Sequence, residues 1–243
     1  RLNPLLHDWL QTPALDGAQE RALKASRWFS DRHQFPEALR YALVSGSLEE
    51  SVRIASEGSE ALLIGQDTAS LLRLRRSLPS GLLEKSARLK IVYGWVHAIG
   101  GQFRQARTLI NDLDNGERPE LAGRVDALRA FILRGEGSVD EALSVADRAL
   151  QAEELSTQGQ LVTQLVRSSA LCAAGKFGDA REANRIAARL AREAGDAGSE
   201  VLAVYAHARI ELGKGSLKHA EQLLRTGLDT AMNESSRPAR VGE

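Results

Sequence analysis

The chain has 243 residues, with 32 basic and 32 acidic side chains that leave no net formal charge at pH 7. The balanced charge excludes an overall field that would gather nucleic acid or anionic membrane on the whole chain. The single cysteine, Cys172, excludes an internal disulfide framework and fits a reducing compartment. No apolar run approaches the ~18 residues that a membrane span needs, and the start of the chain has no signal-peptide pattern. Alanine, leucine, arginine and glutamate dominate while aromatic residues are sparse, so the composition predicts an all-helical, soluble, cytoplasmic protein.

Short helical patterns fill the first third of the sequence. The first two predicted helices span about 1–11 and 18–32, and the second turns Ala22, Ala25, Trp28 and Phe29 inward by their helical spacing. The beginning of the chain reads as though cut from a longer protein.

Three further signals divide this region into helices. Gly46 ends one predicted helix with a residue that tolerates the left-handed conformation. Ser47 then caps the next, and Glu50 three residues later predicts a capping box. A short helix over 67–78 is stopped by Pro79.

A short kernel recurs four times along the rest of the chain: a glycine, any residue, a bulky apolar residue, two more residues, then alanine. The glycines are separated by 36, 38 and 40 residues, a regular period that indicates a repeat protein. Degenerate copies stand at His33-Phe35-Ala38 and Gly46-Leu48-Ser51. The four full instances are Gly101-Phe103-Ala106, Gly137-Val139-Ala142, Gly175-Phe177-Ala180 and Gly215-Leu217-Ala220.

Each kernel joins two predicted helices. The pairs are 84–99 with 103–113, 120–134 with 139–152, 158–173 with 178–194, and 198–212 with 217–231. Small residues recur where paired helices cross, seven residues before each kernel glycine and at the kernel alanine, and the bulky apolar residue of each kernel is predicted to plug its turn.

The predicted fold is therefore all-α: a tetratricopeptide-like α-solenoid of antiparallel helix pairs with an N-terminal helical linker module. The domains are 1–79 for the linker module, 80–232 for the repeats, and 233–243 for a frayed tail or the start of a truncated repeat. The period exceeds that of the consensus repeat and the terminal proline is missing. An alanine-rich bundle without repeats is the alternative, which four aligned kernels disfavour.

Three segments before and at the entry to the repeats form an ordered set. They are Leu2-Asn3-Pro4-Leu5-Leu6-His7-Asp8-Trp9-Leu10, then Trp28-Phe29 with Phe35-Pro36-Glu37-Ala38-Leu39-Arg40-Tyr41-Ala42-Leu43-Val44-Ser45-Gly46, then Leu78-Pro79 with Leu82-Leu83-Glu84, Leu89 and Trp95. Their order and spacing resemble those of one family, the LuxR-type, ATP-dependent transcriptional activators related to the maltotriose-responsive regulator. In the first segment Asn3 stands where that family usually has histidine, and in the third Ser86 stands near its usual proline.

This resemblance implies a role in signal sensing. In such proteins an NTPase and a winged-helix module precede a tetratricopeptide-like sensor, and a C-terminal helix-turn-helix reads DNA. ATP would then belong to a missing NTPase part and DNA binding to a missing C-terminal module. This sequence itself has no phosphate-loop motif, since Gly213-Lys214-Gly215-Ser216 lacks the upstream glycine, and no cofactor is expected in the segment.

A solenoid binds ligands on the face made by its first helices. Positions thirteen, ten, six and three residues before each kernel glycine share one stripe of that face. Arginines beside aromatic rings there can stack on or hydrogen-bond a small-molecule effector, or hold an acidic protein partner. In the alternative reading the apolar members are core and the arginines are solvated. The candidate effector- or partner-binding residues are Arg88, Trp95, Arg124, Phe131, Arg134, Tyr205 and Arg209.

Nothing in the sequence supports catalysis or metal binding. The five histidines share no metal-ligand spacing with Cys172 or one another, and no nucleophile has an identifiable general base. The expected function is a non-enzymatic sensor and protein-interaction segment that controls activator assembly, with self-association left open. The alternative is a free-standing tetratricopeptide adaptor that binds a peptide.

Overall fold

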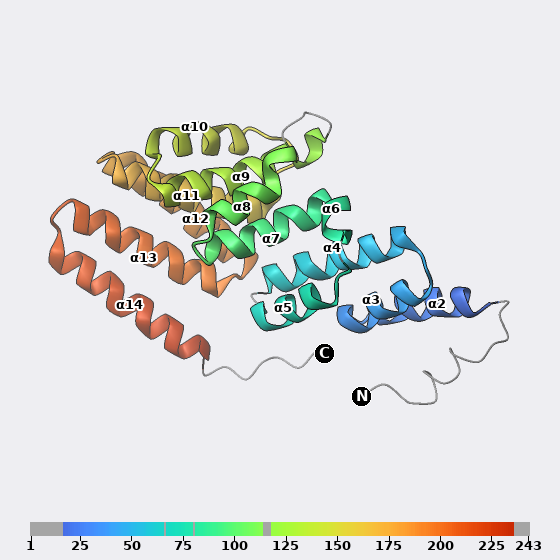
Figure 1. The fold of residues 1–243 in the computed structure, drawn as a ribbon. Helices are drawn as coiled ribbons and strands as arrows, with labels where there is room; N and C mark the ends of the chain where they lie inside the picture. The colour runs from blue at the N-terminus through green and yellow to red at the C-terminus, as the bar shows by residue number, and fades with distance from the viewer. Residues whose placement is uncertain (1–16, 66, 80, 114–117, 236–243) are drawn as a thin grey trace. The chain divides into compact units, whose positions relative to one another are not determined.

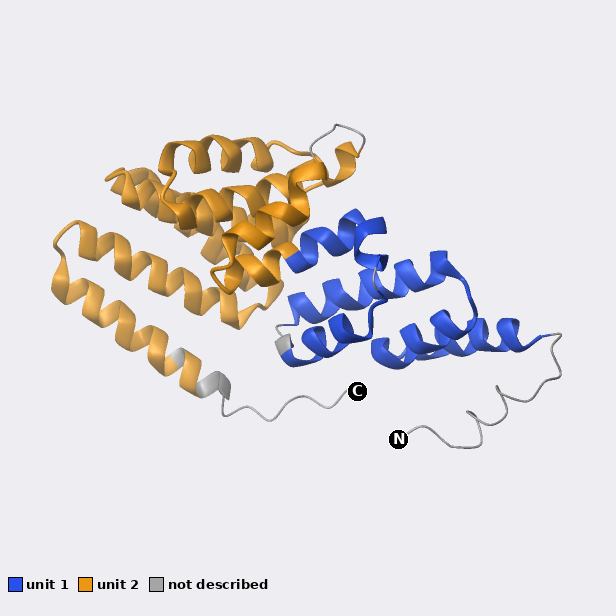
Figure 2. Cartoon of the chain, in the orientation of Figure 1, with its two compact units in different colours: residues 1–93 blue, residues 94–243 orange. Residues whose placement is uncertain are grey.

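The computed structural model describes residues 17–65, 67–79, 81–113 and 118–235, and the helix predicted over 1–11 lies outside them. The described residues form thirteen α-helices and no strand, which confirms the all-helical class (Figure 1). The chain divides into two compact units, residues 1–93 and 94–243, and each is considered by itself (Figure 2).

The first unit packs its helices around α3. That helix contacts α2, α4 and α5. Leucine and isoleucine side chains that are almost wholly shielded from solvent, such as Leu39 and Ile54, form the core. The helices are α2 (Ala18–Ser30), α3 (Phe35–Val44), α4 (Leu48–Ile64), α5 (Thr68–Ser77), α6 (Leu82–Lys85) and the beginning of α7 (Ala87–Ile99).

Trp28 does not point inward as predicted. Its side chain is 49% exposed, and the guanidinium of Arg32 lies 3.8 Å from the centre of the ring. The buried stripe of α2 runs through Ser26 and Ser30. Trp28 is two residues from each of them, which places it about 200° around the helix, on the opposite side. Phe29, also predicted to point inward, lies next to the buried stripe and is half-buried.

The predicted capping box at the start of α4 forms only on one side. Ser47 Oγ accepts the backbone N–H of Glu50 at 3.2 Å, as predicted. The Glu50 carboxylate does not return to Ser47, because it accepts two hydrogen bonds from Arg53 at 2.8 and 2.9 Å. Those bonds from Arg53 hold the pKa of Glu50 below its ordinary value, and the Ser47 N–H donates instead to Ser45 Oγ.

The helix predicted over 84–99 is interrupted at Ser86. The backbone is extended there, with φ −123° and ψ 110°, so α6 ends at Lys85 and α7 begins at Ala87. The hydroxyl of Ser86 accepts the N–H of Leu89 at 3.3 Å and lies 3.1 Å from Ser56 Oγ of α4. Ser86 therefore acts as an N-terminal cap for α7.

The second unit consists of helices packed in neighbouring pairs. Helix α9 packs on α10, α11 on α12 and α13 on α14, and α11 also contacts both α9 and α13. This confirms the predicted pairing for the last three of the four repeats. The helices, after the end of α7, are α8 (Phe103–Ile110) with a short 3-10 turn at Asn111–Leu113, α9 (Pro119–Glu136), α10 (Val139–Leu150), α11 (Thr157–Ala173), α12 (Phe177–Ala194), α13 (Ala197–Gly213) and α14 (Leu217–Ser235).

The four kernels adopt one turn. Their glycines have φ of 75°, 91°, 73° and 82°, in the left-handed region. The residue after each glycine donates its N–H to a carbonyl five positions back, as Ser138 does to Leu133 at 2.9 Å, which is the bond of a Schellman motif. His33, with φ 56°, is the one non-glycine residue with positive φ in the described part of the chain, and Gln34 after it donates to Phe29 in the same way. The degenerate copy at His33 is therefore a true copy of this turn.

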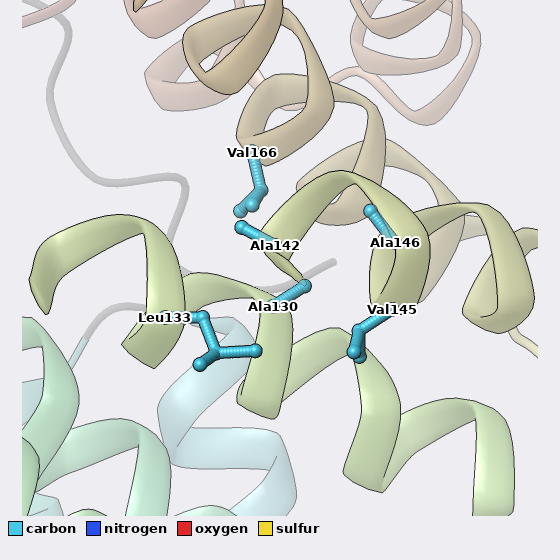
Figure 3. Packing of buried hydrophobic residues seen from close by; sticks show 6 residues of the cluster. All are labelled: Ala130, Leu133, Ala142, Val145, Ala146 and Val166. Carbon is cyan, nitrogen blue, oxygen red and sulfur yellow. The ribbon is translucent and has the colours of Figure 1, made fainter. Parts of the chain in front are cut away.

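Small residues let the paired helices approach. Ala130 of α9 and Ala142 and Ala146 of α10 have no exposed surface and lie in one cluster, which Val166 of α11 joins (Figure 3). In the next pair Ser168 Oγ donates directly to a carbonyl of α12, that of the kernel alanine Ala180, at 2.9 Å. The positions predicted to be small are thus the crossing points of the helices.

The bulky kernel residues differ in what they cover. A Cβ added at Gly135 would lie 2.3 Å from the ring of Phe103, and one at Gly213 would lie 2.5 Å from the ring of Phe177, so both rings rest on a glycine of the following repeat. Leu217 at the last kernel is 65% exposed and does not plug its turn.

Candidate functional site

Arg88 forms an ion pair within the first unit. Its Nε and Nη2 donate to the two carboxylate oxygens of Glu60 on α4, at 2.9 and 2.5 Å. These bonds to Glu60 raise the pKa of the Arg88 guanidinium. Two of its nitrogens are therefore already occupied by a carboxylate.

Trp95 and Phe131 form an aromatic pair in the second unit. Trp95 comes from the end of α7 and Phe131 from α9, and the ring centres lie 5.3 Å apart at 62°, an edge-to-face arrangement. Both side chains are half-buried. Phe131 also packs against the buried cluster of α9, α10 and α11. The pair is thus fixed by packing yet keeps part of each ring open.

Arg134 and Arg209 converge on one hydroxyl, and we call these two residues the arginine pair. Arg134 Nε of α9 donates to Ser169 Oγ of α11 at 3.1 Å, and Arg209 Nη1 of α13 donates to the same oxygen at 3.5 Å. Because α11 contacts both α9 and α13, its serine receives a guanidinium from each side.

The charge of the arginine pair is not balanced by the fold. None of the described residues supplies either guanidinium with a carboxylate within ion-pair distance. Burial lowers the pKa of Arg134, and the positive charge of Arg209 lowers it further. Several arginines elsewhere in the unit do have acidic partners: Arg107 pairs with Glu136, Arg129 and Arg148 with Asp126, Arg167 with Asp147, and Arg185 with Glu182.

Tyr205 and Cys172 flank the arginine pair. Tyr205 is 53% exposed, and the Arg209 guanidinium lies 6.0 Å from its ring centre, at the limit of a cation–π contact. Cys172 lies three residues after Ser169 on α11, and its S–H donates weakly to the Arg209 carbonyl at 3.8 Å. The thiol therefore sits beside the arginine pair.

Arg124 is separated from this group. It is half-buried on α9, ten residues before Arg134, which corresponds to roughly 15 Å along the helix axis. Of the predicted residues, the structure pairs Trp95 with Phe131, brings Arg134 and Arg209 together on Ser169, and places Tyr205 near Arg209.

Ser169 is the residue that sequence reasoning placed on the stripe but did not choose. It stands six residues before its kernel glycine, a position that Trp95, Phe131 and Arg209 occupy in the other repeats. Its small size among large neighbours was the available signal. A serine there leaves room for Arg134 and Arg209 to reach across α11.

A second basic region, which sequence reasoning missed, lies between α12 and α13. A hollow of about 360 Å³ there is lined by Gly178, Arg181, Glu182, Asn184, Arg185, Ala188, Arg192 and His207. Burial, followed by the charge of Arg181, lowers the pKa of His207. The ring of His207 lies 5.7 Å from that of His219, and both rings approach the buried Glu211 carboxylate, at 3.8 and 3.5 Å.

Among the residues that the structure describes, no group of three or more histidine, cysteine, aspartate or glutamate side chains is arranged to hold a metal ion. None of the helices in that part of the chain has the length and apolar character to cross a membrane. No protein-family model matches the chain, and no curated protein sequence is significantly similar to it.

Proposed function

We propose that this chain is the signal-sensing and protein-interaction segment of a transcriptional regulator of the LuxR type, and that its helix pairs form a tetratricopeptide-like solenoid. The effector or partner binds on the face of the first helices of the repeats. The observation that carries this proposal is that first helices of the repeats bear aromatic rings that are exposed or half-buried, and arginines without an acidic partner, at Trp95, Phe131, Arg134, Tyr205 and Arg209.

The origin of these residues explains how binding there can act as a signal. They come from α7, α9 and α13, and Ser169 between them comes from α11. A ligand that touches several repeats at once is sensitive to how the repeats pack on each other. A ligand shifts an equilibrium between two arrangements only through its different affinity for each, and such a multi-helix site supplies that difference.

The sequence resemblance supports the regulatory setting. In regulators of this type, ATP hydrolysis and DNA reading belong to other parts of the protein, and the proposal for this segment covers neither. The alternative is a peptide-binding adaptor, which the arginine pair also suits, because guanidinium groups bind the carboxylates of acidic peptides.

A thermal-shift screen of metabolites and acidic peptides on the 243-residue chain tests the proposal, since a ligand that binds only the folded state raises its stability. Calorimetry then measures each hit on Trp95→Leu and on a matched control, Trp28→Leu, in which an exposed tryptophan of the first unit is changed. We expect weaker binding to Trp95→Leu and unchanged binding to Trp28→Leu.

If Trp95→Leu and an Arg134→Gln variant bind every hit with the affinity of the parent chain, this face is not the binding site. Hits confined to peptides favour the adaptor, and a small-molecule hit favours the sensor.

A further inference from the structure

We propose that the arginine pair and Ser169 hold an anionic group of the ligand, a carboxylate or a phosphate. This assignment deepens the proposed function, because it names the chemistry that the first-helix face recognises. The site joins Arg134 of α9, Ser169 of α11 and Arg209 of α13.

The positive charge of the arginine pair has no acidic partner among the described residues. Two guanidinium groups that both contact one serine oxygen repel each other, and partial burial weakens the screening by water. Charged side chains are almost never fully buried in proteins unless they are paired, because removing a charge from water is costly. Here the fold supplies only a neutral hydroxyl, so an anion from outside would remove the repulsion.

The arginine pair also has N–H donors to offer a ligand. A guanidinium carries five N–H donors in a rigid fork, and each member of the arginine pair gives one nitrogen to Ser169. The remaining donors of both forks are available to planar or tetrahedral oxyanions, which arginine binds in a bidentate manner. Ser169 keeps both side chains in place before the ligand arrives.

The surroundings indicate what the rest of the ligand is like. Phe131 lies three residues before Arg134, and Tyr205 lies four residues before Arg209, so each arginine has a ring on the same face of its own helix. Tyr205 is exposed and Phe131 is partly open. These rings suit an apolar or aromatic body attached to the anionic group.

The hollow between α12 and α13 is the competing location for an anion. It is also basic, yet two of its lining residues, Arg185 and Glu182, already form an ion pair at 2.6 Å. The experiment therefore includes a variant of the hollow, Arg181→Gln, which leaves the arginine pair intact.

Two probes separate the two sources of negative charge: sodium benzoate, a carboxylate with an aromatic body, and inorganic phosphate. Sodium chloride at the same ionic strength is the reference. Binding to the 243-residue chain is measured by calorimetry. A local readout is the rate at which iodoacetamide, a neutral reagent, alkylates Cys172, which is the single cysteine and lies beside the arginine pair.

We expect at least one probe to bind saturably and to slow the alkylation of Cys172. Arg134→Gln and Arg209→Gln should each weaken that binding by about tenfold to a hundredfold, as expected for a lost hydrogen bond to a charged group. In Arg134→Gln the amide nitrogen takes the place of Nε, the atom that donates to Ser169. Without any added anion, Arg209→Gln should melt at a higher temperature than the parent chain, because the repulsion is gone.

The matched control is Arg189→Gln with Arg225→Gln, two exposed arginines of the same unit that pair with acidic residues one turn away. This double variant removes two positive charges and should leave probe binding and Cys172 protection unchanged.

Three results would overturn the assignment: an affinity in Arg134→Gln and Arg209→Gln that is unchanged from the parent chain, loss of binding only in Arg181→Gln, or no saturable binding of either probe. If the probes fail while a neutral effector still depends on Trp95, the anion assignment is wrong and the proposed function stands. If a probe binds at the arginine pair but no metabolite or peptide depends on this face, the proposed function is wrong and the anion site stands.

Discussion

Replacing Gly137 with alanine isolates the conformational cost of the kernel turn. Gly137 has φ 91° and ψ 2°, and a Cβ built on it meets no atom within 4 Å. The substitution therefore causes no clash, and its effect comes from the backbone alone. A residue with a Cβ is destabilised by about 1–2 kcal/mol in the left-handed region. Alanine also reduces the conformational freedom of the unfolded chain, which stabilises the folded state by about 0.4–1 kcal/mol. We expect a net destabilisation of about 1 kcal/mol, the difference between these two estimates.

Urea denaturation of the whole chain, followed by far-ultraviolet circular dichroism, measures this change. Gly137→Asn should lose less stability than Gly137→Ala, because asparagine tolerates the left-handed region better. Gly178 provides the opposite control: it lies near the start of α12 without a positive φ, and an added Cβ there also meets nothing within 4 Å. Gly178→Ala should stabilise the protein, by up to about 1 kcal/mol. Equal effects of Gly137→Ala and Gly178→Ala would refute the reasoning.

Three further predictions concern packing and charge in the second unit. Asp126→Ala should lower the free energy of unfolding by about 1–3 kcal/mol, because Asp126 is buried and accepts two 2.6 Å hydrogen bonds from Arg148. A double-mutant cycle with Arg148→Ala measures the coupling between the two residues, and additive effects would contradict the prediction. Gly94→Ala should lower the free energy of unfolding by about 1–3 kcal/mol, because the added Cβ would lie 2.7 Å from the Leu128 side chain. The smaller side chain in Leu128→Val should restore part of this stability, as measured by urea titration. Burial lowers the pKa of His207 in the folded protein from its ordinary 6.5. The unfolded chain therefore binds this proton more strongly than the folded protein does, and the stability falls as the pH drops below 6.5. His207→Gln should flatten that fall below about pH 6.5, and an unchanged slope in thermal melts would rule out this histidine as its source.

The kernel turn was predictable because its cause is local. A glycine that takes a positive φ, a bulky residue two positions later and an alanine five positions later are enough to define the end of one helix and the start of the next. The same turn at His33 shows that the pattern survives the loss of the glycine.

Features that depend on residues distant in sequence were not predictable in this way. The helical spacing of Trp28 fits an inward position, but the neighbours of α2 bury the stripe of Ser26 and Ser30 instead. The break at Ser86 similarly involves a hydroxyl contact with Ser56, thirty residues away. Periodicity shows that a helix has a buried face, and tertiary packing decides exactly which residues belong to it.

The candidate site shows the same division between local and tertiary causes. Sequence spacing placed Arg88 and Arg134 on one stripe with equal standing, because both stand at repeat positions of the first helices. The fold then gives Arg88 a carboxylate, from Glu60, and leaves Arg134 facing another arginine across Ser169. An arginine on such a stripe is a strong candidate for ligand binding only where the fold gives it no acidic partner. A guanidinium that is paired with a carboxylate already uses two of its N–H donors in that pair. That criterion needs the three-dimensional partners of each side chain, and it moves the predicted site from a long stripe to the point where α9, α11 and α13 meet.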